Sequence, residues 1–125
     1  MLHVRRALPV ALLVLTVAAY GSLATAQAPA KMTDGVLTNT AGMTLYTFDK
    51  DAGDKSACNG PCAASWPPLM AGADAKASGD WSIVTRDDGA KQWAHKGKPV
   101  YLWVKDQKPG DKTGDGVQSV WHIVK

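Results

Sequence analysis

GMTLYTFDKD (residues 42–51) and GKPVYLWVKD (residues 97–106) repeat one pattern, and this repetition decides the fold. Each segment contains a glycine, a short strand-like run, a tyrosine, an aromatic residue two positions later and a final Lys-Asp. Each is followed by Gly-Asp-Lys, and each initial glycine lies 24 residues before a tryptophan, Trp66 or Trp121. The offset of 55 residues therefore indicates two pseudo-repeats.

Short strands separated by tight turns dominate the rest of the chain. The strands are expected at 36–38 and 44–49 as a hairpin, as three runs within 81–106, and in 117–124. One helical turn is expected near 60–66, where Pro61 occupies a tolerated first position. Because two or three strands alone are unstable in water, the repeats are expected to bury their apolar faces together. We therefore predict a mostly β fold, a small antiparallel β domain.

The N-terminus has the layout of a secretory signal peptide. Arg5 and Arg6 precede an apolar run, and small residues lead to an A-x-A site that ends at Ala26. The run is too short for a membrane span, and no later segment approaches the roughly 20 apolar residues that a span needs. The expected organisation is a signal peptide at 1–26, a flexible segment at 27–34 and one β domain at 35–125, with repeats at 35–80 and 81–125. The mature protein is expected in the periplasm or secreted.

The charge pattern argues against a nucleic-acid partner. Without Arg5 and Arg6, 12 basic groups face 11 acidic groups, and every acidic group is an aspartate. The lysines are scattered among the aspartates, whereas a nucleic-acid surface needs a concentrated basic patch. We expect a monomer whose partner is an envelope protein or a small ligand.

The motif Tyr-x-(Phe/Trp/Tyr)-x-x-Asp occurs twice. Its six residues are Tyr46, Phe48, Asp51, Tyr101, Trp103 and Asp106. This double motif resembles the bacterial family of secreted repeats of unknown function, many of them predicted lipoproteins. The segments SACNGPCAASWPPL, QWAHKGKPVYLW and PGDKTGDGVQSVWHIV extend the resemblance over about residues 34–125. The resemblance implies a small exported β domain and brings no catalytic residues, and this chain lacks the lipobox cysteine of lipoprotein members.

Cys58 and Cys62 are the only two cysteines of the chain. An exported chain meets an oxidising compartment. Four positions apart around Gly60 and Pro61, the cysteines can reach the roughly 4.4–6.8 Å Cα separation of a disulfide. A structural disulfide is our main interpretation. The alternative is a copper-binding or thiol-redox site that uses both cysteines with His95 or His122.

Two aspartate-rich turns, DKDAGD at 49–54 and DKTGDG at 111–116, raise the possibility of calcium. Neither has the spacing of a calcium loop or a bidentate glutamate, so solvated Asx turns explain them more simply. Asp51 and Asp106 are expected to cap turns by accepting backbone N–H bonds. His95 and His122 are interpreted as rim residues packed on aromatic neighbours, and no cofactor is expected.

No nucleophile elbow or catalytic triad is recognisable in the sequence. We therefore expect a non-enzymatic binding or structural module of the cell envelope, whose tryptophans form the core between the repeats. The alternative is a periplasmic copper-binding or redox protein that uses Cys58 and Cys62.

Overall fold

The computed structural model describes residues 29–125, so the predicted signal peptide and its cleavage site lie outside the described residues. The strands are β1 (Ala30–Thr33), β2 (Val36–Asn39), β3 (Tyr46–Phe48), β4 (Trp81–Thr85), β5 (Lys91–His95), β6 (Lys98–Pro99) and β7 (Trp121–Ile123). They form three small sheets with the pairings β1–β2, β3–β7 and β4–β5–β6, all antiparallel. The predicted fold class, mostly β with small antiparallel sheets, is confirmed.

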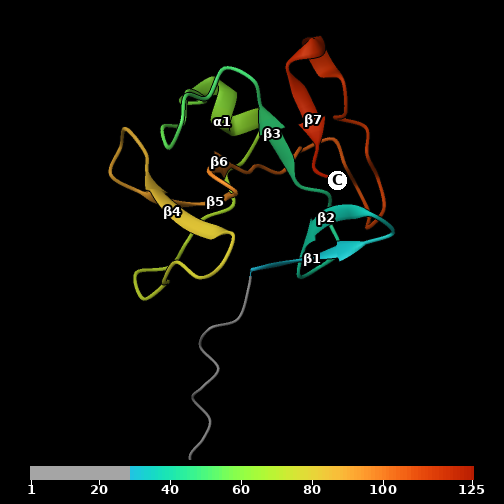
Figure 1. Cartoon of the computed structure of the whole chain (residues 1–125). Coiled ribbons are helices and arrows are strands. Elements are labelled where there is room, and N and C mark those ends of the chain that lie inside the picture. Colours follow the sequence, from blue (N-terminus) through green and yellow to red (C-terminus); the bar gives the residue numbers. More distant parts are fainter. Residues whose placement is uncertain (1–28) are drawn as a thin grey trace, which may run out of the picture.

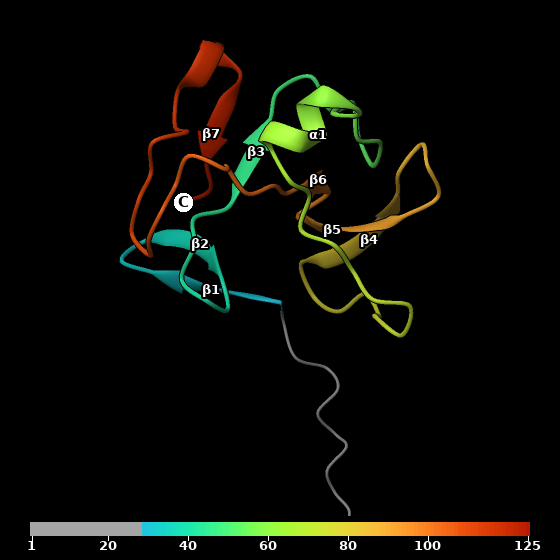
Figure 2. The same ribbon diagram turned by 180° about the vertical axis from the view of Figure 1, so that it is seen from behind.

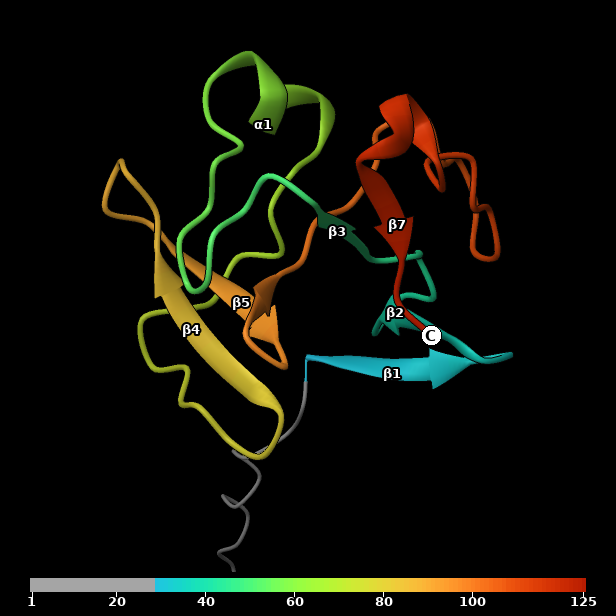
Figure 3. The same cartoon turned by 45° about the horizontal axis from the view of Figure 1, so that its top comes forward.

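Strand β3, which pairs with β7, lies between the other two sheets. The β4–β5–β6 sheet lies on one side of the molecule and the β1–β2 hairpin on the other, with β3 between them (Figures 1 and 2). The short helix α1 (Pro61–Ser65) confirms the expected helical turn and lies at the same end as the 3₁₀ helix Val117–Ser119 (Figure 3). Between residues 29 and 125, no helix has the length and apolar character needed to cross a bilayer.

The hairpin expected between 36–38 and 44–49 forms only in the part next to its turn. Asn39 N donates to Met43 O at 2.8 Å, and Leu45 N donates to Leu37 O at 3.0 Å. Beyond this point β3 leaves β2 and pairs with β7, in a register that places Phe48 opposite Trp121. The aromatic contact across the repeats therefore takes priority over the local pairing.

Two further expectations need correction. Residues 30–33, within the segment expected to be flexible, form β1 and pair with β2 through a turn at Asp34 and Gly35. Both turn residues have positive φ, 52° and 83°, as a two-residue hairpin turn of this handedness requires. The strand expected over 117–124 is reduced to β7, because Gln118 and Ser119 adopt positive φ of 51° and 60° and curl the chain into the 3₁₀ helix.

The core consists of two clusters. The first, here called the aromatic cluster, is built on Tyr46, Cys58, Trp66, Tyr101 and Trp121. The second, around Leu37, Leu45, Trp81 and Val100, lies beneath the β1–β2 and β4–β5 hairpins. Each cluster contains residues from both repeats, so neither repeat holds a complete core of its own.

Candidate functional site

The two motif tyrosines meet at the centre of the molecule. Tyr46 N donates to Tyr101 O at 2.8 Å, and Tyr101 N donates to Tyr46 O at 2.9 Å. Both side chains are fully buried. The two copies of the motif are therefore joined directly through their backbones, at equivalent positions.

The tyrosine hydroxyl groups cross between the repeats. Tyr46 Oη donates to Asp106 Oδ2 at 2.6 Å, and Tyr101 Oη donates to Asp51 Oδ2 at 2.8 Å. Each tyrosine thus binds the aspartate of the other repeat. We call these contacts the crossed Tyr–Asp pairs.

The second oxygen of each aspartate holds the turn that follows its own strand. Asp51 Oδ1 accepts a hydrogen bond from Ala57 N at 2.7 Å. Asp106 Oδ1 accepts from Thr113 N at 2.9 Å and from Thr113 Oγ1 at 2.6 Å. The capping role expected for both aspartates is confirmed, and the crossed pairs add a long-range bond to each cap.

Burial sets the protonation of these groups. It raises the pKa of Tyr46 and of Tyr101 well above the ordinary value, and the adjacent Asp106 and Asp51 raise them further. Both phenols therefore remain protonated donors near neutral pH. Burial also raises the pKa of Asp51, although bonds from Ala57 N and Tyr101 Oη oppose that shift.

Arg86 is a buried cation beside the crossed pairs. Its guanidinium donates to Ser56 Oγ at 3.0 Å, to Gln92 Oε1 at 2.7 Å and to the Cys58 carbonyl at 2.5 Å. Ser56 Oγ in turn lies 2.5 Å from Tyr101 Oη. Sequence reasoning missed this residue, although it is the single arginine outside the predicted signal peptide. Its planar guanidinium offers five N–H donors in a fixed fork, which suits several acceptors held at separate positions.

Four aromatic rings form a continuous stack across the repeats. The ring centroids of Trp103 and Trp66 are 3.8 Å apart, those of Trp66 and Trp121 are 3.8 Å apart, and those of Trp121 and Phe48 are 4.2 Å apart. Phe48 and Trp103, the second aromatic residues of the two motifs, thus each stack on the tryptophan of the other repeat. The second aromatic residues of both motifs therefore pack across the repeats.

Cys58 and Cys62 form a disulfide with a Cα separation of 5.2 Å. Neither sulfur is therefore a thiolate, the form that binds copper or exchanges disulfides. His95 packs on Trp81 with ring centroids 4.8 Å apart, and His122 Nε2 lies 2.8 Å from Asp49 Oδ2. In the described range 29–125, no three His, Cys or Asp side chains are grouped so that they could hold a metal ion.

Four of the five aspartates in the two suspected calcium turns, Asp49, Asp51, Asp111 and Asp115, form hydrogen bonds with protein groups. Asp111 Oδ2 accepts from the backbone N–H groups of Gln107 and Lys108, and Asp115 Oδ1 accepts from Ile123 N. The Lys108 ammonium group 2.9 Å from Asp111 also lowers the pKa of that carboxyl. The donor N–H groups lie four and three residues before Asp111 and eight residues after Asp115, whereas an Asx turn uses the N–H two residues later. The Asx-turn interpretation is therefore wrong for these aspartates, which instead hold together longer loops.

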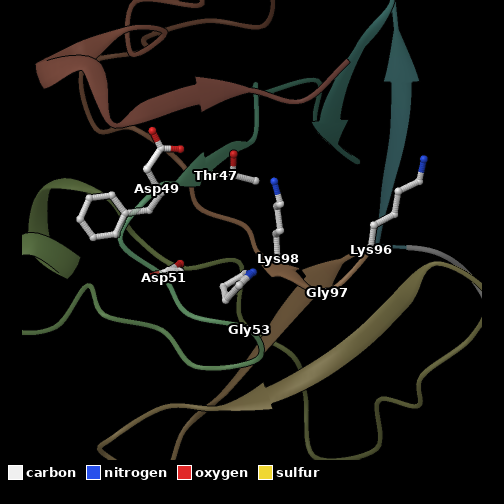
Figure 4. Close-up of a pocket in the computed structure, with 9 residues that line it drawn as sticks. Thr47, Asp49, Asp51, Gly53, Lys96, Gly97 and Lys98 are labelled. Atoms are coloured by element: carbon white, nitrogen blue, oxygen red, sulfur yellow. The ribbon is translucent and has the colours of Figure 1, made fainter.

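A pocket of about 300 Å³ opens beside Asp51. One wall is the end of β3 and its following turn, with Asp49 and Asp51, and the opposite wall is the β5–β6 turn, with Lys96 and Lys98 (Figure 4). Thr47, on β3, also lines the pocket. We call this hollow the charged pocket, and Asp51 belongs both to it and to a crossed Tyr–Asp pair.

The fold and the crossed pairs define a small β protein made of two interlocked repeats. The model of a family described as secreted repeats of unknown function matches the chain twice, at residues 29–70 and 82–125. The chain belongs to this family. No curated protein and no solved structure matches it.

Proposed function

We propose that this protein is an exported, non-enzymatic binding module of the cell envelope. The crossed Tyr–Asp pairs carry this proposal, because they commit the polar groups of the family motif to joining the two repeats. Tyr46 and Tyr101 are buried donors with raised pKa values, so they are poorly suited to exchange protons with a substrate at neutral pH. The motif therefore holds the two repeats in one fixed arrangement, which gives the protein surface a fixed shape.

A fixed surface suits binding, since a preorganised site loses little conformational entropy when a ligand binds. The family is one of secreted repeats, which fits an exported protein. We place the mature chain in the periplasm or outside the cell, after cleavage near Ala26, as a monomer.

Native mass spectrometry of the mature chain tests this function. The chain is incubated with amino acids, short peptides and oligosaccharides, and both the protein and the added molecules are weighed afterwards. A binding module gives non-covalent mass additions and leaves every added molecule unchanged. Chemical conversion of an added molecule, abolished by Asp51→Asn with Asp106→Asn, would show that the motif is catalytic and the proposal wrong.

A further inference from the structure

The charged pocket has opposite charges on opposite walls. Asp49 and Asp51 follow β3, whereas Lys96 and Lys98 flank Gly97 in the β5–β6 turn (Figure 4). Among the ion pairs of the described residues, Lys55–Asp87, Lys108–Asp111 and His122–Asp49, neither pocket lysine takes part. Two ammonium groups therefore border the pocket without a carboxylate within ion-pair distance.

The lysine wall continues beyond the pocket. A neighbouring hollow is lined by Thr47, His95, Lys96, Lys98 and Lys125, so it shares both lysines and Thr47. Lys96 and Lys98 thus line both hollows, whereas Asp49 and Asp51 line only the charged pocket.

Lys96 occupies a backbone position that disfavours lysine. It has φ of 52° and precedes Gly97 with φ of 84°, in the two-residue turn between His95 and Lys98. The β1–β2 turn has nearly the same angles, 52° and 83°, but carries Asp34 and Gly35, a pair that suits this turn. Because lysine is uncommon at such a position, its side chain is a candidate for a role in the pocket that it borders.

We propose that the charged pocket binds a small zwitterion, an α-amino acid or a short peptide, with its carboxylate at Lys96 and Lys98 and its ammonium group at Asp49 and Asp51. This inference rests on the proposed binding function and names the ligand class. A cavity of about 300 Å³ accommodates a molecule of this size. Thr47, on β3 at the edge of the pocket, offers a hydroxyl group that can donate to the carboxylate.

A simple anion fits the pocket less well than a zwitterion. Asp49 and Asp51 line the same pocket, so an anion placed at Lys96 and Lys98 would add to the negative charge already there. A simple cation meets the reverse problem at the lysines. Only a ligand with both charges is matched to both walls.

Nitrogen-15 NMR of the mature chain tests the proposal with glycine, glycylglycine and triglycine as probes. Saturable shifts of the Thr47, Asp49, Gly53 and Gly97 amides are expected. The probe with the lowest Kd shows whether a free amino acid or a peptide is preferred. N-acetylglycine and glycinamide each lack one charge, and each should bind about two- to fivefold more weakly than glycine, as expected for one lost exposed ion pair.

Lys96→Asn separates binding from folding. Asparagine suits the first position of this turn, so the variant should keep the fold while its Kd rises by about two- to fivefold. Asp49→Asn keeps an acceptor for His122 and should weaken binding similarly. Lys76→Asn makes the same charge change at an exposed position outside the pocket and should bind like the wild type.

The proposal is overturned if no probe gives saturable shifts at millimolar concentration. It is also overturned if the blocked analogues bind as well as glycine, or if folded Lys96→Asn binds like the wild type. If none of the probes binds in the NMR titration but another envelope molecule binds without chemical change in the mass measurement, the proposed zwitterion site is wrong and the proposed binding function is supported. Conversion of a bound probe into product would instead contradict the non-enzymatic function.

Discussion

At the scale of single residues, each motif tyrosine donates a hydroxyl hydrogen bond that joins the two repeats, so the loss of either hydroxyl group should destabilise the fold. Tyr46 Oη donates to Asp106 and also accepts from Gly114 N at 3.1 Å. Tyr46→Phe leaves both partners buried without their bond and should lower the free energy of unfolding by about 1–3 kcal/mol. Urea denaturation measures this loss.

Two further variants complete the test of the crossed pair. Tyr46→Phe should cost much less in an Asp106→Asn background, because the charged acceptor is already absent. Thr85→Ala, which removes an exposed hydrogen bond from Lys91, should change stability by no more than about 0.5 kcal/mol. Additive effects at Tyr46 and Asp106 would show that the pair is not coupled.

Gly114 is required where the aromatic stack approaches the backbone. A Cβ atom there would lie 2.7 Å from Trp66 Cη2 and 3.0 Å from Tyr46 Cε2. Gly114→Ala should therefore cost about 1–3 kcal/mol of unfolding free energy by overpacking. Gly72 has open space at the same atom and no positive φ, so Gly72→Ala should be neutral within about 0.5 kcal/mol. Equal thermal midpoints for the two variants would contradict the predicted clash.

His95 should make stability depend on pH. Burial against Trp81, and then the charge of Lys96, lower its pKa below the ordinary 6.5, although Asp80 opposes the shift. As pH falls through 6.5 toward the folded-state pKa, the unfolded chain binds the proton first, so the free energy of unfolding decreases. Above 6.5 this contribution is complete.

Proton NMR of the His95 ring gives the pKa directly, and denaturation between about pH 7.5 and about pH 5 gives the stability change. His95→Gln should lose less stability than the wild type over that range. A ring pKa at or above 6.5, or an unchanged slope in the variant, would contradict the assignment.

At the scale of elements, α1 depends on the disulfide. The helix has only five residues and no side-chain N-cap, and its last hydrogen bond joins Trp66 N to Cys62 O at 2.8 Å. Closing so short a loop stabilises by about 2 kcal/mol on the chain-entropy estimate. Reduction should lower the free energy of unfolding by about that amount and should loosen α1 first.

Hydrogen exchange measures the local effect. With reductant, the amides of Ala64 and Trp66 should exchange faster by a larger factor than the amide of Tyr46, which is bonded to Tyr101 O in the central pairing. In the double variant that carries Cys58→Ser and Cys62→Ser, the same reductant should leave the amide exchange rates unchanged, because no disulfide remains to be reduced. Copper added to the reduced wild type tests the alternative metal site, and stoichiometric binding there would favour it.

The sequence predicts local structure more completely than pairing. Alternating runs and glycine turns locate β4, β5 and the α1 turn, because these signals act over a few residues. They do not show that β3 chooses β7 over β2, since that choice depends on Trp121, far along the chain. β1 was missed for a related reason: its side chains are largely exposed, so they show no buried face.

The candidate site shows the same division. The repeat identifies Tyr46, Asp51, Tyr101 and Asp106 as equivalent pairs, but equal spacing fits bonds within a repeat as well as between repeats. That each tyrosine binds the aspartate of the other repeat can be seen only in the fold, where the backbones of Tyr46 and Tyr101 pair with each other. The charged pocket could not be predicted, because its walls come from segments about 45 residues apart that meet only in the folded chain.

At the scale of the whole molecule, the two repeats should fold only together. β3 has its partner strand, its stacked tryptophan and its crossed aspartate in the second repeat. A chain of residues 27–76 should therefore be unfolded alone, as should residues 77–125, because the break lies in an exposed loop but divides both core clusters. Each fragment should give a narrow amide spectrum and no near-ultraviolet circular dichroism from ordered tryptophans.

Mixing the two fragments in equal amounts supplies the control. If the crossed pairs and the stack hold the repeats together, the mixture should recover part of the spectrum of the intact chain, and dilution should reverse the recovery because the association is bimolecular. The Asp106→Asn version of the second fragment should associate more weakly than the wild-type fragment, since it lacks the charged acceptor for Tyr46. A dispersed, native-like spectrum from either fragment alone would mean that one repeat completes its own core, and the crossed pairs would then join two domains instead of building one.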